Sequence, residues 1–225
     1  MINGYTLAIE GATYTGSVAV LSDGQVMAEH DLVETRIGRQ GRPEGVLPAV
    51  EDCLRRAAIE IGDVAKIVCG AGPGSFTSLR IAASVAKGLS AGTGAQLYAV
   101  PSLALTVAAA NGLSAGKYIS VVDAMRDELY ALDVELNLDG GMIYGETARR
   151  IPAAELDHLA HAAGARVIGP GREIEARPQA RGALALLDSI IQRGPVDLQS
   201  WEPDYGRAAE AQVRWESKHG PLEIR

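Results

Sequence analysis

The stretch of residues 69–94 constrains the fold more than any other part of the sequence. The short apolar run at residues 67–69 predicts a buried strand. The chain then breaks into the glycine-rich segment GAGPGS and continues as an alanine-rich sequence. Glycine allows backbone conformations that other residues avoid, and Ser75 or Thr77 can cap the free amide groups at the start of a helix. The pattern therefore predicts a strand, a tight loop and a helix in direct succession.

The predicted helix carries small side chains spaced by four, at Ser78, Ala82, Ala86 and Ser90. Residues four apart lie on the same face of a helix, so this face allows another backbone to come close. A tight loop followed by such a helix can hold an anion, dock a partner protein or pack within the core. The rest of the sequence has to distinguish these three roles.

The surrounding segments predict a mixed α/β chain. Three strand patterns, at residues 5–9, 17–21 and 25–30, are joined by short turns and indicate an antiparallel meander. A helix predicted over residues 43–61 follows, and strands then alternate with helices up to residue 112. The order β-β-β-α-β-α-β-α is typical of a ribonuclease-H-like lobe, in which helices cover the faces of a mixed sheet.

A shorter version of the same order begins again near Lys117. Its predicted elements are strands at 118–122, 128–137 and 142–151, a helix over 152–163, a strand at 166–168 and a helix over 180–193. Two similar halves indicate a duplicated fold. We expect an N-terminal ribonuclease-H-like lobe of residues 1–112 and a smaller C-terminal lobe of residues 113–225.

Charge and composition narrow the possible functions. The chain has 21 Lys and Arg against 28 Asp and Glu, a net charge of −7. This charge argues against a protein whose main task is to bind nucleic acid, because such proteins use basic residues to neutralise phosphates. Cys53 and Cys69 lie in apolar patterns, so we expect both to be buried. The N-terminus lacks the pattern of a signal peptide, and no apolar run reaches the roughly 20 residues that cross a bilayer. We expect a cytoplasmic protein that makes no membrane contact.

Two glycine-containing turns are candidate phosphate sites. Glu10, Gly11 and Thr13 combine the acid, the glycine and the hydroxyl that a magnesium-bound triphosphate requires. The loop at residues 72–75 precedes a helix N-terminus, where amide groups favour anions. However, Pro73 has no N–H group, and the loop contains no lysine. We expect both turns to be structural, with the first a vestigial phosphate loop and a working nucleotide site as the alternative.

Metal and hydrolase chemistry have little support in the sequence. His158 and His161 are three apart on a predicted helix, but no third ligand stands at a suitable spacing. Ser75 has no histidine that the sequence places beside it. We therefore expect no metal site and no catalytic residue. The alternative is an ATP-dependent or peptidase-like enzyme that acts on its own.

The residues GAGPGSFTSLRIAASVAKGL resemble the GPGSFTG-LRIG signature of the TsaB (YeaZ) family, which helps to make threonylcarbamoyladenosine beside the anticodon of certain tRNAs. The resemblance extends along most of the chain, from residues 7–9 to the segment at 203–207. Glu10 stands where the family usually has Asp, Ser78 where it has Gly, and Met125 where it has Arg. The signature-loop residues that match are Gly72, Pro73, Gly74, Ser75, Thr77 and Arg80.

This resemblance implies the actin-like ATPase (ASKHA) fold, built from two ribonuclease-H-like lobes. It also implies a non-catalytic scaffold that forms a heterodimer with a TsaD-like catalytic subunit, is joined by a TsaE-like ATPase, and meets tRNA only through the complex. ATP or ADP with Mg²⁺ is expected only at an interface with these subunits. The helices over 43–61 and from 75 onward would form the pairing face, and a homodimer would form in isolation. The predicted interface residues are Val46, Val50, Cys53, Ser78, Ala82, Ala86 and Ser90.

Overall fold

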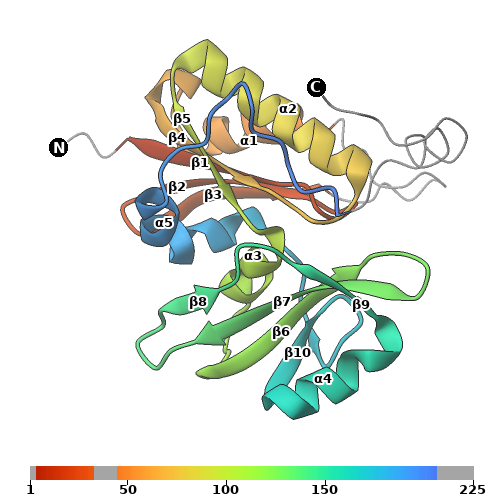
Figure 1. The fold of residues 1–225 in the computed structure, drawn as a ribbon. Coiled ribbons are helices and arrows are strands. Elements are labelled where there is room, and N and C mark those ends of the chain that lie inside the picture. The colour runs from red at the N-terminus through yellow and green to blue at the C-terminus, as the bar shows by residue number, and fades with distance from the viewer. Residues whose placement is uncertain (1–3, 33–44, 207–225) are drawn as a thin grey trace, which may run out of the picture.

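Two β-sheets, one from each half of the chain, enclose a layer of helices in the computed structural model, which describes residues 4–32 and 45–206 (Figure 1). The first half contains β1 (Tyr5–Glu10), β2 (Ser17–Ser22), β3 (Gln25–Asp31), α1 (Val46–Ala57), η2 (Ile61–Asp63), β4 (Val64–Gly70), α2 (Phe76–Thr93), β5 (Gln96–Val100) and α3 (Ser102–Ala109). The second half contains β6 (Gly116–Asp123), β7 (Glu128–Leu136), β8 (Met142–Tyr144), β9 (Arg149–Pro152), η3 (Ala153–Glu155), α4 (Leu156–Ala163), β10 (Ala165–Gly169), β11 (Ile174–Glu175), η4 (Ala180–Gly182) and α5 (Ala183–Gln192).

The two sheets have the same strand order. The first runs β3-β2-β1-β4-β5 and the second β8-β7-β6-β10-β11, with β9 also paired to β7. In each sheet the first strand lies at the centre and is antiparallel to the strand that follows it. On its other side it is parallel to a later strand, β4 in the first sheet and β10 in the second. This is the order of a ribonuclease-H-like lobe, and two such lobes make the actin-like ATPase (ASKHA) fold. The predicted fold class is confirmed.

The side-chain alternation of the central strands places the helices in layers. On β1, Leu7 and Ile9 belong to the core under α1 and α2, whereas Ala8 belongs to the core shared with α3 and α5. On β6, Tyr118 faces that shared core and Ile119 faces the core under α4. The layer of α3 and α5 therefore joins the two lobes. Among the described residues, no helix combines the length and apolarity that a membrane span requires.

Several predicted elements differ from the observed ones at their ends. The helix predicted over 43–61 ends at Ala57 in the described part, because Ala58 adopts a left-handed conformation with φ 55°. The strand predicted over 142–151 is interrupted and forms β8 and β9, and the two-residue strand β11 was not predicted. The helix predicted over 180–193 begins as the 3₁₀ turn η4. The glycine-rich and basic sequence of residues 35–43 predicts an exposed loop, and this segment lies outside the described residues.

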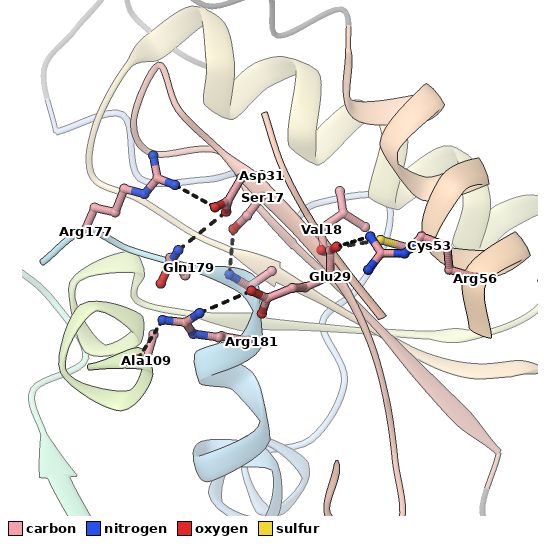
Figure 2. A network of polar contacts seen from close by, with 11 residues as sticks. Ser17, Val18, Glu29, Asp31, Cys53, Arg56, Ala109, Arg177, Gln179 and Arg181 are labelled. Atoms are coloured by element: carbon pink, nitrogen blue, oxygen red, sulfur yellow. Dashed lines mark hydrogen bonds and ion pairs between the residues drawn. The ribbon is translucent and has the colours of Figure 1, made fainter. Parts of the chain in front are cut away.

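Polar contacts tie the start of the last helix to the edge of the first sheet (Figure 2). The Arg177 guanidinium lies 2.9 Å from the Asp31 carboxylate on β3. The amide of Ala180 donates a hydrogen bond of 2.8 Å to the hydroxyl of Ser17 on β2. The second half of the chain is thus held on the first by ionic and backbone contacts as well as by the shared core.

The chain then returns to the first lobe after α5. The amide of Val196 donates to Leu97 O on β5 at 2.8 Å, and the Lys87 ammonium donates to Trp201 O at 2.9 Å. Residues 196–205 therefore contact the first lobe although they follow the second in sequence. The predicted division into two lobes by residue number stays a prediction.

Candidate functional site

The two glycine-containing turns singled out by the sequence lie against each other. The parallel pairing of β1 and β4 brings both turns to the carboxyl edge of the first sheet. There the amide of Ser75 donates to Ala12 O at 2.7 Å. A Cβ placed on Gly74 would lie 2.1 Å from the same oxygen, so only glycine fits at this close approach. The sequence predicted each turn, but not that they touch.

Glu10 ends β1 and is fully buried. One carboxylate oxygen, Oε1, accepts a hydrogen bond from the amide of Ala12, while Oε2 has no partner and lies against Gly70. Burial raises the pKa of Glu10 to about 7, although the hydrogen bond from the amide of Ala12 and the polar influence of the Ser102 side chain lower it. The carboxyl group is therefore protonated in much of the population at neutral pH. Because the chain encloses this carboxyl group completely, a magnesium ion and the water molecules it retains have no access to it in this arrangement.

The amide groups of the loop after β4 are already engaged within the chain. Ala71 N donates to Val100 O at 2.8 Å. Gly72 N donates to the Ser102 hydroxyl at 3.0 Å, a contact that the sequence did not predict. A phosphate cradle needs such amides free, and Pro73 has none. As arranged in this chain, the two turns do not fit a magnesium-bound triphosphate. A nucleotide held together with a partner subunit stays a prediction.

The remaining signature residues lie nearer the surface. Thr77 and Arg80 are exposed on the first turns of α2, and Thr13 is half-buried in the turn after β1. The Arg80 guanidinium carbon lies 5.4 Å from the centre of the Phe76 ring. The Phe76 and Tyr205 rings pack with their centres 4.7 Å apart. The sequence did not predict this aromatic pair, although Tyr205 lies in the C-terminal segment that carries the family resemblance.

The side chains predicted to form the partner interface are buried within the chain itself. They pack α1 and α2 against the first sheet, so the structure corrects the sequence-based assignment of an outward docking face. Small residues spaced by four are required wherever two backbones approach closely, and here the second backbone belongs to the same chain. The seven residues and their exposed fractions are Val46 2%, Val50 1%, Cys53 0%, Ser78 5%, Ala82 0%, Ala86 0% and Ser90 2%.

The outward face of the same helices carries exposed apolar and small residues. Leu47 on α1 is 46% exposed. Ser84, Gly88 and Gly92 are exposed and spaced by four on α2. A Cβ placed on either glycine would meet no atom within 4 Å, so the described chain gives no packing reason for them. Glycine within a helix is about 1 kcal/mol less favourable than alanine. This face therefore offers room for another backbone.

Hydrolase chemistry finds no support among residues 4–32 and 45–206. His158 and His161 are exposed on α4, and the described residues contain no group of three or more His, Cys, Asp and Glu that could hold a metal. The Ser75 hydroxyl lies 3.1 Å from another serine hydroxyl on α2. Cys53 and Cys69 are free and buried, which confirms their predicted burial.

A cavity of about 180 Å³ lies at the carboxyl ends of β4 and β5. The loop after β4 and the end of β5 form its walls on the first lobe. Glu146 and Arg193 line it from the second half of the chain, and Asp204 lines it from the returning C-terminal segment. The cavity is therefore bounded by both lobes and adjoins the signature loop.

Comparison with known proteins identifies the family. Residues 42–191, more than half of the chain, match the family model described as "TsaD: tRNA N6-adenosine threonylcarbamoyltransferase". The chain is 30% identical over 155 residues to the tRNA threonylcarbamoyladenosine biosynthesis protein TsaB of Escherichia coli, covering 68% of this chain and 64% of that protein. It is 28% identical over 232 residues to TsaB of Bacillus subtilis, covering 93% and 96%. The chain belongs to this family, among its TsaB (YeaZ) members.

Coverage differs among these TsaB relatives. The match spans less than two thirds of the E. coli protein and 51% of the TsaB protein of Haemophilus influenzae. Solved structures extend the likeness over nearly the whole fold. YeaZ from Pseudomonas aeruginosa superimposes with a TM-score of 0.72 at 27% identity, covering 89% of this chain and 98% of that one. The family expected from the signature residues is confirmed.

Proposed function

We propose that this chain is a non-catalytic subunit of the complex that makes threonylcarbamoyladenosine in tRNA. Involvement in that pathway is supported by the TsaB relatives and by the TsaD-type family model. The observation that carries the non-catalytic role is the enclosure of Glu10, the acid of the turn where this fold would hold magnesium. The engaged amides of the signature loop support the same conclusion.

The partner in this proposal is a TsaD-like catalytic subunit, and a TsaE-like ATPase joins the pair. The outward face of α1 and α2 is the surface we assign to pairing, because Leu47 is exposed there and Gly88 and Gly92 leave room for a helix to approach closely. The same face would support a homodimer in isolation. ATP or ADP with Mg²⁺ would be shared at an interface with the partners, and tRNA would be reached through the complex.

Reconstitution tests the non-catalytic role. Purified chain is mixed with threonylcarbamoyl-adenylate and tRNA, with and without a TsaD-like and a TsaE-like protein, and modified nucleoside is measured. We expect modification only when the TsaD-like subunit is present, and more of it when this chain is added. Robust modification by this chain alone would overturn the proposal. Tight stoichiometric binding of ATP and Mg²⁺ to the isolated chain, measured by calorimetry, would favour the alternative of an independent ATP-dependent enzyme.

The pairing surface is tested by Gly88→Arg, which fills the open space on α2. We expect at least a tenfold weaker association with the TsaD-like subunit, measured by sizing with light scattering, and an unchanged unfolding temperature. Leu138→Arg is the matched control, since Leu138 is 98% exposed on the second lobe. Equal association of wild type and Gly88→Arg would remove this face from the interface.

A further inference from the structure

Residues 203–206 lie directly on the signature loop. The amide of Asp204 donates to Ala71 O at 2.7 Å. A Cβ placed on Gly72 would lie 2.3 Å from the carbonyl oxygen of Asp204, so the two backbones are as close as glycine allows. Pro203 is buried at the same place. The segment therefore covers the loop that carries the family signature.

Contacts on either side hold the segment across both lobes. On the first lobe, the Tyr205 ring packs on Phe76 at the start of α2. On the second lobe, a Cβ placed on Gly206 would lie 2.3 Å from the Tyr130 ring on β7, so the backbone of Gly206 lies directly against that ring. The Asp204 carboxylate accepts a hydrogen bond from the amide of Gly206 at 2.7 Å and fixes the turn between them. The segment thus bridges the first lobe and the second.

The segment also contributes to the cavity between the lobes, because Asp204 is one of its lining residues. Glu146, Arg193 and the loop at residues 71–73 line the same cavity. Among the described residues, a backbone hydrogen bond, the ring pair and the close approach of Asp204 to Gly72 join the segment to the first lobe. Upstream, Val196 is held separately by its hydrogen bond to β5. Short segments held by such individual contacts open locally while the rest of the fold stays intact.

We propose that residues 203–206 form an intramolecular latch across the two lobes. The closed latch covers the signature loop. Its release frees the carbonyl oxygen of Ala71 and removes Asp204 from the wall of the adjoining cavity. Any ligand or partner that contacts the loop backbone at Ala71 and Gly72 must first displace the latch. This inference rests on the contacts of the chain itself and is independent of the proposed scaffold role.

Hydrogen–deuterium exchange of the full chain, followed by mass spectrometry, tests the latch. Tyr205→Ala removes the ring pair, and Gly206→Ala places a Cβ against the Tyr130 ring. In both variants we expect the amides of residues 204 and 206 to exchange about tenfold faster, because their hydrogen bonds are lost when the segment opens. Losing an aromatic contact such as the Tyr205 ring pair shifts an equilibrium by about that factor. Tyr205→Phe keeps the ring and is expected to exchange as the wild type does.

Two outcomes would overturn the latch. The first is unchanged exchange at residues 204 and 206 in both Tyr205→Ala and Gly206→Ala. The second is exchange that rises equally along β1 and β4, which would mean that the segment only stabilises the whole lobe. Selective acceleration at residues 204 and 206, with the unfolding temperature unchanged, is the result that supports a latch.

Discussion

The two lobes share a strand order, yet the acids that end their central strands have opposite surroundings. Glu10 ends β1 and is fully buried, whereas Asp123 ends β6 and is exposed. Side chains alternate between the two faces of a strand, so Glu10 lies on the same face of β1 as Ala8, toward the layer of helices between the lobes. By the same alternation, Asp123 lies on the same face of β6 as Val121, which faces the outer core under α4. An offset of one residue at the strand end therefore decides whether the acid is enclosed or solvated.

The lobes also differ after β4 and β10, the strands that pair in parallel with the two central strands. β4 leads through the signature loop into α2, a helix of 18 residues, whereas β10 leads through a short loop directly into β11. The first lobe therefore has a second helix on its outer face, with a buried side and an open side. The second lobe has only α4 on its outer face among the described elements. The extra helix gives the first lobe the surface that we assign to pairing.

The largest expected effect on stability comes from placing arginine on the buried side of α2 rather than on its exposed side. Ala82 is 0% exposed, so Ala82→Arg buries a charge without a partner and should lower the free energy of unfolding by more than about 4 kcal/mol. Ser84→Arg, two residues along on the exposed side, should change it by less than about 0.5 kcal/mol. Urea denaturation followed by circular dichroism measures both. A folded Ala82→Arg variant with an unchanged midpoint would show that this side of α2 is not core.

The next largest effect concerns the stability of the chain as a function of pH, which Glu10 and Asp123 are expected to influence differently. The pKa of Glu10 is about 7 in the folded chain against an ordinary value of 4.5, so the folded state holds the proton more tightly. Stability therefore falls as pH rises from about 4.5 to about 7, by about 3 kcal/mol in all. Glu10→Gln should remove this loss, making the variant more stable than wild type at pH 8 and similar to it near pH 4.5.

Asp123→Asn is the matched control for Glu10→Gln. Asp123 is exposed and accepts a hydrogen bond from the amide of Met125 at 2.8 Å. We expect its stability difference from wild type to stay small and nearly constant between pH 5 and 8. Denaturation at several pH values measures both variants. A Glu10→Gln profile that runs parallel to wild type would show that Glu10 is ionised and solvated in the folded chain.

The smallest expected effect on stability concerns two ion pairs, one between the halves of the chain and one inside the second lobe. Arg181 pairs with Glu29 at 3.2 Å and also donates to Ala109 O, and both charged side chains are about one third exposed (Figure 2). Arg181→Ala should lower stability by about 1 kcal/mol, and added salt should reduce the ionic part. Arg149→Ala breaks an exposed pair with Asp133 inside the second lobe and should have less than half that effect. Equal losses of stability in Arg181→Ala and Arg149→Ala would show that the contact between the halves stabilises the fold no more than an exposed ion pair does.

Much of the site could be predicted from the sequence because its signals are local. Glycines and proline at residues 70–75 predicted the loop, and the acid, glycine and hydroxyl at Glu10, Gly11 and Thr13 predicted the first turn. The protonation of Glu10 could not be predicted, because it depends on Gly70 and Ser102, which are distant in sequence. The side of α2 that faces the core was also ambiguous, since both sides carry small residues spaced by four.

The sequence by itself determined the family, through the signature residues after β4. It also determined the fold class and most of the order of the elements, because hydrophobic period and turn residues act over a few neighbours in the chain. Only the tertiary structure decided that Ala82 and Ala86 pack inward while Gly88 and Gly92 face open space. It also decided that residues 203–206 cover the signature loop. These outcomes depend on which distant segments share an edge of the sheet, and parallel pairing of β1 and β4 sets that edge.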